Sequence, residues 1–187
     1  MSAADENTLD ASGQSLTGLP AVIATLAAER PVFHSEADFQ HSLAWHLKLA
    51  DPAARIRLET RPVRGMRLDI LVESRGRRTA LELKYLVKRF HGDVGGEVFD
   101  LPDQSAHGIS RYDVVKDIVR TESFVANGVA DEGRTIVLTN DRRTGGRGAT
   151  RTRSTHSSGS TKTGFWQARF GGAIEPARVR RGLGKRS

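Results

Sequence analysis

Three side chains in the middle of the sequence have the types and spacing of a hydrolytic metal site: Asp69, Glu82 and Lys84. Two carboxylates on neighbouring strands suit a hard divalent cation such as Mg²⁺ or Mn²⁺, which prefers oxygen ligands. Such a cation polarises a phosphodiester and lowers the pKa of a bound water, and a lysine beside it stabilises the developing negative charge. We therefore predict Asp69 and Glu82 as metal ligands and Lys84 as the catalytic amine. The competing interpretation is an ordinary surface ion-pair cluster, in which Lys84 neutralises the two acids.

A β-hairpin is expected to bring these side chains together. Residues 68–72 and 79–86 are apolar-rich runs on either side of a polar loop that contains glycine. A loop with an even number of residues places Asp69 directly opposite Glu82, whereas an odd loop breaks that register. Lys84 then shares the face of Glu82, because side chains alternate along a strand. The other face is apolar and carries Leu68, Ile70, Val72, Leu81, Leu83 and Tyr85.

An amphipathic helix is predicted before the hairpin, over residues 36–49. Ser35 is a natural N-cap, Asp38 stands at the third helical position, and Pro52 prevents continuation of the helix. Glu36 lies in the first turn, where an acid complements the helix dipole. A shorter helix is expected before it.

The remaining elements follow from hydrophobic patterning. Residues 55–62 alternate and predict a strand antiparallel to the hairpin, and the apolar run 135–139 predicts a buried strand. Residues 87–103 contain several glycines and are predicted to form an irregular loop. A long helix is expected from about residue 103 or 105 to residue 126. Its predicted buried side consists of Ile109, Tyr112, Val115, Ile118, Val119 and Val125.

The sequence pattern is similar to that of a known superfamily. Asp69, twelve further residues and then Glu82-Leu83-Lys84 resemble the motif of the PD-(D/E)xK nucleases, although Leu68 stands where the proline of that name would be. The resemblance covers roughly residues 35–140, and the predicted order of helix, three strands, helix and strand matches it. It implies an α/β fold with a restriction-endonuclease-like αβββαβ core, in which helices flank a mixed sheet.

The resemblance also implies supporting residues. In the superfamily an acid on the first helix often completes the metal site, which points to Glu36. The helix after the hairpin commonly sends a Gln, Arg or Tyr to the active site, which points to Gln104 in catalysis and Arg111 on phosphate. Lys88 and Arg89 follow the hairpin and are candidates for further phosphate contacts.

The length of 187 residues suits one domain with two tails. We expect a disordered N-terminus over residues 1–17, a folded domain over residues 18–141, and a basic, disordered Arg/Gly/Ser/Thr-rich tail over residues 142–187. The net charge of +7 belongs to the tail, because residues 1–140 carry −3 and residues 141–187 carry +10. Two interpretations of the tail are open: a basic arm that holds nucleic acid by its phosphates, or an end without a role that arose from a reading-frame shift.

Composition excludes several classes of protein. The chain has no cysteine, so it forms neither disulfides nor thiolate metal sites. No apolar stretch is long enough to span a membrane, and the N-terminal residues lack the apolar core of a signal peptide. We therefore expect a cytoplasmic location without membrane contact.

These features predict a Mg²⁺- or Mn²⁺-dependent nuclease, a hydrolase of phosphodiester bonds in nucleic acid, with DNA as the expected substrate. The alternative is a non-catalytic nucleic-acid- or protein-binding module that retains the nuclease fold. A homodimer or a partner subunit is also considered, because the core has no helix-turn-helix or zinc finger with which to read bases.

Overall fold

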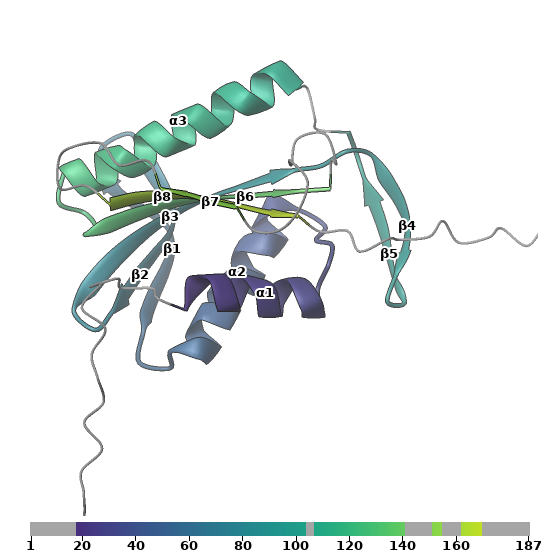
Figure 1. Cartoon of the computed structure of the whole chain (residues 1–187), viewed down its shortest axis with the longest axis horizontal. Coiled ribbons are helices and arrows are strands. Elements are labelled where there is room, and N and C mark those ends of the chain that lie inside the picture. The colour runs from purple at the N-terminus through teal and green to yellow at the C-terminus, as the bar shows by residue number, and fades with distance from the viewer. Residues whose placement is uncertain (1–17, 104–106, 141–150, 155–161, 170–187) are drawn as a thin grey trace, which may run out of the picture.

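The computed structural model describes residues 18–103, 107–140, 151–154 and 162–169, and of residues 107–111, 151–154 and 162–169 it describes the backbone alone. This part of the chain is an α/β fold in which helices cover both faces of a mixed sheet (Figure 1). The helices are α1 (Leu19–Glu29), α2 (Glu36–Ala50) and α3 (His107–Ala126). Helices α1 and α2 lie on one face of the sheet, and α3 lies on the other.

The main sheet has six strands in the order β1-β2-β3-β6-β8-β7. Strand β2 runs antiparallel to both of its neighbours, β1 and β3, and β6 runs parallel to β3, as predicted. Strand β8 adds parallel to β6, and a separate hairpin joins β4 to β5. The strands are β1 (Arg55–Val63), β2 (Met66–Ser74), β3 (Arg77–Leu86), β4 (Phe90–Val94), β5 (Glu97–Leu101), β6 (Glu132–Thr139), β7 (Arg151–Ser154) and β8 (Lys162–Arg169).

The start of α2 is fixed as predicted. The Oγ of Ser35 accepts a hydrogen bond from the backbone N–H of Asp38 at 3.1 Å, which satisfies one of the free amides at the helix N-terminus. Arg30, just after α1, donates to both carboxylate oxygens of Asp38 at 2.8 and 3.0 Å. These contacts join α1 to α2 and orient the first turn of α2, which carries Glu36.

The β2–β3 hairpin has the even, two-residue loop on which the predicted register depends. Ser74 pairs with Arg77, and the turn residues Arg75 and Gly76 have φ angles of 52° and 74°. Positive φ at both central positions is typical of the type I′ turn of tight hairpins. The pairing continues along the strands to Ile70 and Leu81. The next position holds Asp69 and Glu82, and there the two strands part.

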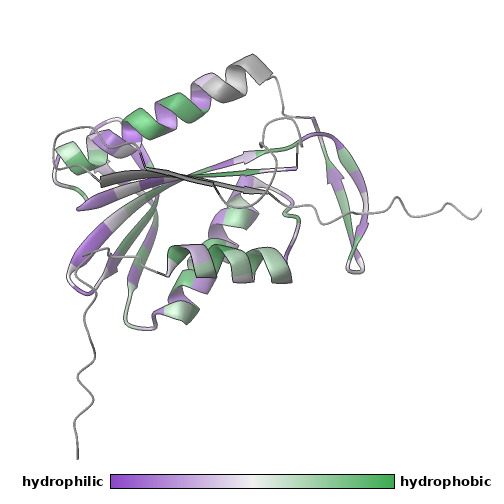
Figure 2. Ribbon diagram, in the orientation of Figure 1, coloured by the Kyte–Doolittle hydropathy of each residue, from purple (hydrophilic) through white to green (hydrophobic). Residues whose placement is uncertain are grey.

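Two apolar cores lie on the two faces of the sheet. The larger one joins α1 and α2 to the sheet through residues that include Phe39, Leu43, Ile70, Leu81, Leu83, Tyr85 and Ile136. The smaller one lies beneath α3 and contains Leu68, Leu71, Ala80, Phe124 and Ala130. Figure 2 shows the difference between the helices, since α3 has purple bands between its green ones whereas α1 is green along most of its length.

The prediction for Leu68 was wrong. Leu68 packs in the smaller core beneath α3, whereas Ile70, two residues later in the same strand, packs in the larger core. The regular alternation of side chains is broken between these two residues, at the position where Glu59 of β1 has a left-handed φ of 56° between the paired residues Leu58 and Thr60. Such an irregularity re-aims the side chains that follow it.

The predicted buried face of α3 was also wrong. Tyr112, Val115 and Val119 are 62%, 55% and 54% exposed, while Asp117 and Thr121 are buried against the sheet together with Phe124. Ile118 and Val125 are half-buried, and the side chain of Ile109 lies outside the described residues. The physical reason is that polar side chains of α3 pair with polar side chains of the sheet. The Oγ1 of Thr121 lies 3.1 Å from the Oγ1 of Thr135 on β6, and Asp117 lies beside Lys84 of β3.

Two segments have more regular structure than their composition suggested. Residues 87–103 contain the hairpin β4–β5 in place of an irregular loop, with Gly95 and Gly96 at positive φ in its turn. Phe99 and Leu101 attach this hairpin to the larger core. In the segment predicted to be a disordered tail, β7 and β8 are strands, and the rest of that segment lies outside the described residues, as do residues 1–17. No helix in the described part of the chain is long and apolar enough to cross a membrane.

Candidate active site

The free edge of β3 organises the site. Beyond Leu81, β2 no longer pairs with β3, so the outward amides of β3 need other acceptors. The N–H of Leu83 donates to Oδ2 of Asp69 at 2.7 Å, and the N–H of Tyr85 donates to Oε2 of Glu36 at 2.9 Å. Two carboxylates, one from β2 and one from α2, thus take the place of a neighbouring strand.

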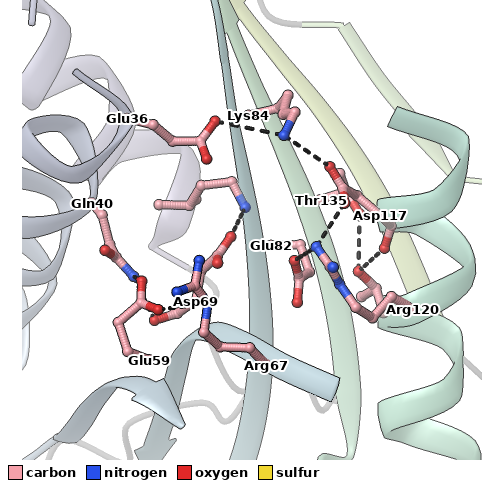
Figure 3. Close-up of polar contacts among 12 residues, drawn as sticks. Glu36, Gln40, Glu59, Arg67, Asp69, Glu82, Lys84, Asp117, Arg120 and Thr135 are labelled. Atoms are coloured by element: carbon pink, nitrogen blue, oxygen red, sulfur yellow. Dashed lines mark hydrogen bonds and ion pairs between the residues drawn. The ribbon is translucent and has the colours of Figure 1, made fainter. Parts of the chain in front are cut away.

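Lys84 lies between helices from opposite faces of the sheet. Its Nζ is 3.9 Å from Oε2 of Glu36 on α2 and 3.9 Å from Oδ2 of Asp117 on α3 (Figure 3). The side chain is 27% exposed, so the ammonium can be reached from solvent. Lys84 therefore sits where a cationic group can act on a molecule held among these acids.

Glu82 is completely buried and is bound to a cation from α3. Nη2 of Arg120 lies 2.5 Å from Oε2 of Glu82 and 2.7 Å from Oδ1 of Asp117. The second oxygen of Glu82, Oε1, has no hydrogen-bond partner among the described residues. A buried carboxylate with one unused oxygen is costly unless something else satisfies it.

Burial raises the pKa values of the acids in this site. Burial, aided by the negative charge of Asp69, raises the pKa of Glu82 to about 8 although the Arg120 guanidinium opposes the shift. Burial likewise raises the pKa of Asp69, Glu36 and Asp117 above their ordinary values, against hydrogen bonds and nearby cations that lower them. Perturbed carboxyl groups in one cluster are characteristic of functional sites.

A second layer of contacts holds the backbone of Asp69. The amide Nε2 of Gln40, which is buried in α2, donates to the carbonyl oxygen of Asp69 at 2.7 Å and to Oε1 of Glu59 at 2.9 Å. Nε of Arg67 lies 2.8 Å from Oε2 of Glu59. Glu59 has φ of 56°, a left-handed conformation that is uncommon for residues other than glycine. Strained positions of this kind persist where surrounding contacts maintain them, often beside active sites.

The structure brings together the main predicted residues. Asp69, Glu82, Lys84 and Glu36 converge at the point where β2 and β3 part (Figure 3). Gln104, which was predicted to act in catalysis, lies outside the described residues.

The predicted phosphate contacts are placed only in part. Arg111 lies in α3, but its side chain is not described. Lys88 and Arg89 follow the end of β3. The backbone of Lys88 is bound in both directions by the side chain of Asn140, at 2.7 and 3.0 Å, and Arg89 is exposed.

Sequence reasoning missed Asp117, Arg120 and Gln40. The first two were overlooked because the apolar residues of α3 were assigned to its buried side, which turned its polar side toward solvent. The spacing of Asp117 and Arg120, three residues apart, places both on one face of a helix and is the signal that was available. For Gln40 the position one turn after Glu36 was the only indication.

The donor set suits a hard cation, although no group of three or more His, Cys, Asp or Glu side chains in the described part of the chain is arranged to hold a metal ion. Asp69 and Glu82 provide oxygen ligands of the kind that Mg²⁺ and Mn²⁺ prefer. The unused Oε1 of buried Glu82 is the atom that fits a cation best. The two oxygens that Arg120 binds show that this cluster already takes up positive charge.

Comparisons of the chain with protein-family models, with curated proteins and with solved structures find no match in any of the three. The residues of the site are therefore the basis for any assignment of function.

Proposed function

We propose that the chain is a metal-dependent phosphodiesterase that cleaves nucleic acid, with DNA as the expected substrate, on a core of the restriction-endonuclease-like type. One observation carries the proposal: Glu82, fully buried with an unused carboxylate oxygen, lies beside Asp69 and two residues from Lys84 where β2 and β3 part. The resemblance of this motif to the PD-(D/E)xK nucleases supports the same conclusion. So does the order of α2, β1, β2, β3, α3 and β6, with β6 parallel to β3.

Each residue has a distinct task in this proposal. Asp69 and Glu82 hold a divalent cation, which when bound polarises the scissile phosphodiester and acidifies a water molecule. Lys84, between α2 and α3, orients the attacking water and stabilises the negative charge that develops on the phosphate. Glu36 fixes the edge of β3 through the amide of Tyr85 and lies beside the Lys84 ammonium. By resemblance to the superfamily, the 3′ oxygen leaves and the product carries a 5′-phosphate.

The charge distribution supports a polyanionic substrate. Residues 141–187 carry a net charge of +10, whereas residues 1–140 carry −3. A basic segment in the same chain as an acidic site can hold a nucleic acid by its phosphates while the acids bind the cation. Affinity for nucleic acid is then expected to fall steeply as salt rises.

The proposal is tested by metal binding and cleavage in parallel. Calorimetric titration with Mn²⁺ should show binding to the wild type and none to Asp69→Ala. Plasmid nicking in Mg²⁺ should be lost in Lys84→Met but kept in Lys48→Met. Lys48 is a suitable control, because it lies near the other end of α2 and donates there to the carbonyls of Pro52 and Ala54. A folded wild type that binds no divalent metal would refute the proposal.

A second candidate function is a non-catalytic binding module that keeps this fold. The observation in its favour is that Arg120 already neutralises Glu82 at 2.5 Å, as in a structural ion pair. The two candidates differ in what Lys84→Met does. If the chain is a binding module, Lys84→Met retains the nucleic-acid affinity, and neither the wild type nor the variant nicks DNA in the presence of metal. If the chain is a nuclease, the wild type nicks DNA and Lys84→Met does not.

A further inference from the structure

Arg120 places a positive charge between two buried carboxylates. Its Nη2 lies 2.5 Å from Oε2 of Glu82 and 2.7 Å from Oδ1 of Asp117, so one nitrogen bridges a strand and a helix. Ligand oxygens lie about 2.0–2.1 Å from Mg²⁺ and about 2.3–2.6 Å from larger ions such as Ca²⁺. The distances from Nη2 to the two oxygens are those of short charge-assisted hydrogen bonds, so a metal ion in the same place would draw both oxygens closer.

Two further oxygens of the same carboxylates are unused. Oε1 of Glu82 and Oδ2 of Asp117 are both buried and have no hydrogen-bond partner among the described residues, although Oδ2 of Asp117 lies 3.9 Å from the Lys84 ammonium. Glu82 is 0% exposed and Asp117 is 4% exposed. One guanidinium therefore leaves half of the available oxygen ligands unsatisfied, which points to a ligand of higher charge and smaller radius.

We propose that Glu82 and Asp117 form a divalent-cation position that the guanidinium of Arg120 fills when no metal is bound. This inference rests on the proposed function, because it specifies how the metal of the nuclease site is held. It adds Asp117, which the motif does not contain, to the metal ligands. It also makes Arg120 a competitor of the metal.

Displacement of Arg120 follows from geometry. A metal ion that binds Oε2 of Glu82 and Oδ1 of Asp117 takes the space of Nη2, so the two cations cannot bind these oxygens together. The Arg120 side chain is 36% exposed, and its Nε has no hydrogen-bond partner in the described part of the chain, so the bonds from Nη2 to the two acids are the contacts that a metal ion has to replace. Arg120 therefore lowers the affinity for the metal, and the free guanidinium becomes available to a phosphate group.

The test is a Mn²⁺ titration of the whole chain by calorimetry, with Arg120→Gln compared with the wild type. Competition predicts that Arg120→Gln binds Mn²⁺ about tenfold more tightly, since the ion no longer has to displace a charge from two buried acids. Arg67→Gln is the matched control. Both arginines lie near Asp69 and lower its pKa, but Arg67 binds Glu59 and does not contact Glu82. The affinity of this variant for Mn²⁺ should change by less than about threefold, because Arg67 acts on the site by long-range attraction and through Glu59, while Gln40 still holds the carbonyl of Asp69.

Asp117→Asn supplies the second arm. If Asp117 is a ligand, this variant binds Mn²⁺ at least about tenfold more weakly, although Asn keeps the shape and can still accept from Arg120. Arg120→Gln leaves two buried acids without a cation and could fail to fold, in which case Arg120→Lys replaces it. Lysine retains the positive charge but bridges the two carboxylates poorly. Arg120→Lys should therefore bind Mn²⁺ more tightly than the wild type.

The outcomes separate this inference from the proposed function. Suppose that the wild type binds Mn²⁺ and that Asp69→Ala does not. If Asp117→Asn then binds Mn²⁺ as the wild type does, and Arg120→Gln binds it no more tightly, the inference is overturned and the nuclease proposal stands. Tightening of the same size in Arg67→Gln also overturns it, since general electrostatics would then suffice. No binding by any folded variant overturns both.

Discussion

The backbone amide of Leu83 donates a 2.7 Å hydrogen bond to Oδ2 of Asp69, so a side chain of β2 completes the edge of β3 after the two backbones have parted. This bond gives Asp69 two separable roles. It is an acceptor that satisfies a buried amide, and it is a negative charge in a cluster of acids. An asparagine can replace the first role but not the second.

Asp69→Asn and Asp69→Ala should therefore differ in stability and agree in metal binding. The asparagine keeps an acceptor for Leu83, so its free energy of unfolding should lie within about 1 kcal/mol of the wild type. The alanine leaves that amide unpaired and should cost about 1–3 kcal/mol. Urea denaturation measures these values, and calorimetry should show Mn²⁺ binding abolished in both variants. Binding retained by Asp69→Asn would remove Asp69 from the metal ligands.

The pKa of Glu82 predicts how stability depends on pH. Burial raises this pKa from 4.5 to about 8 in the folded protein, so between these values the folded chain holds a proton that the unfolded chain has lost. The contribution of Glu82 to the free energy of unfolding should therefore be fully present below about pH 4.5 and be lost as pH rises through about 8. Urea denaturation in EDTA between pH 5 and pH 8 measures this slope, with no divalent metal bound.

Glu82→Gln should flatten that slope, because its amide does not titrate. Some slope remains, since burial also raises the pKa of Asp69, Glu36 and Asp117. Glu122→Gln, on the exposed side of α3, is the control. Its free energy of unfolding should change with pH as steeply as that of the wild type. Equal slopes in the wild type and Glu82→Gln would show that Glu82 is ionised throughout.

Local sequence signals predicted the parts of the fold that local interactions determine. The position of the hairpin loop around Gly76, the Ser35 cap and the antiparallel path of β1 to β3 follow from turn chemistry, capping and alternation, and the structure selects the two-residue loop among the even lengths. The convergence of Asp69 with Glu82 needed only the register that this turn sets. These features depend on residues close together in the chain, which is why one sequence sufficed.

Tertiary contacts decided what the sequence could not. Periodicity placed Tyr112, Val115 and Val119 in the core, because it assumes that helix α3 covers an apolar surface. The face of the sheet beneath α3 carries Glu82 and Thr135, so α3 turns Asp117 and Thr121 toward it and leaves the apolar residues outside. Hydrophobic patterning misassigns a helix when the surface that it covers holds a polar site.

The conformation of Glu59 predicts an unusual response to glycine. At φ of 56°, a residue with a Cβ is strained by about 1–2 kcal/mol, and glycine is not. Glu59→Ala and Glu59→Gly both remove the carboxylate that binds Gln40 and Arg67, so they differ only in backbone preference. Glu59→Gly should be the more stable by about 1 kcal/mol in urea denaturation. Greater stability of Glu59→Ala would mean that this strain is absent.

The close approach of α3 to β6 is a further point that one methyl group can test. A Cβ added at Gly133 would lie 2.3 Å from Cγ2 of Thr121 and 3.1 Å from its carbonyl oxygen. Gly133→Ala should therefore lower the free energy of unfolding by about 1–3 kcal/mol, because helix and strand must separate. Gly18→Ala is the control, since nothing lies within 4 Å of its added Cβ and its φ is ordinary.

Thr121→Ser in the Gly133→Ala background should restore part of the loss. It removes the nearer of the two clashing atoms but keeps the hydroxyl that binds the Asp117 carbonyl at 2.7 Å. Because α3 carries Asp117 and Arg120, its displacement in Gly133→Ala should also weaken Mn²⁺ binding, and the added serine should recover it in proportion to stability. A double-mutant cycle in urea denaturation and calorimetry measures both effects. Strict additivity of the two substitutions would show that Gly133 and Thr121 are not in contact, and that the position of α3 over the site is set elsewhere.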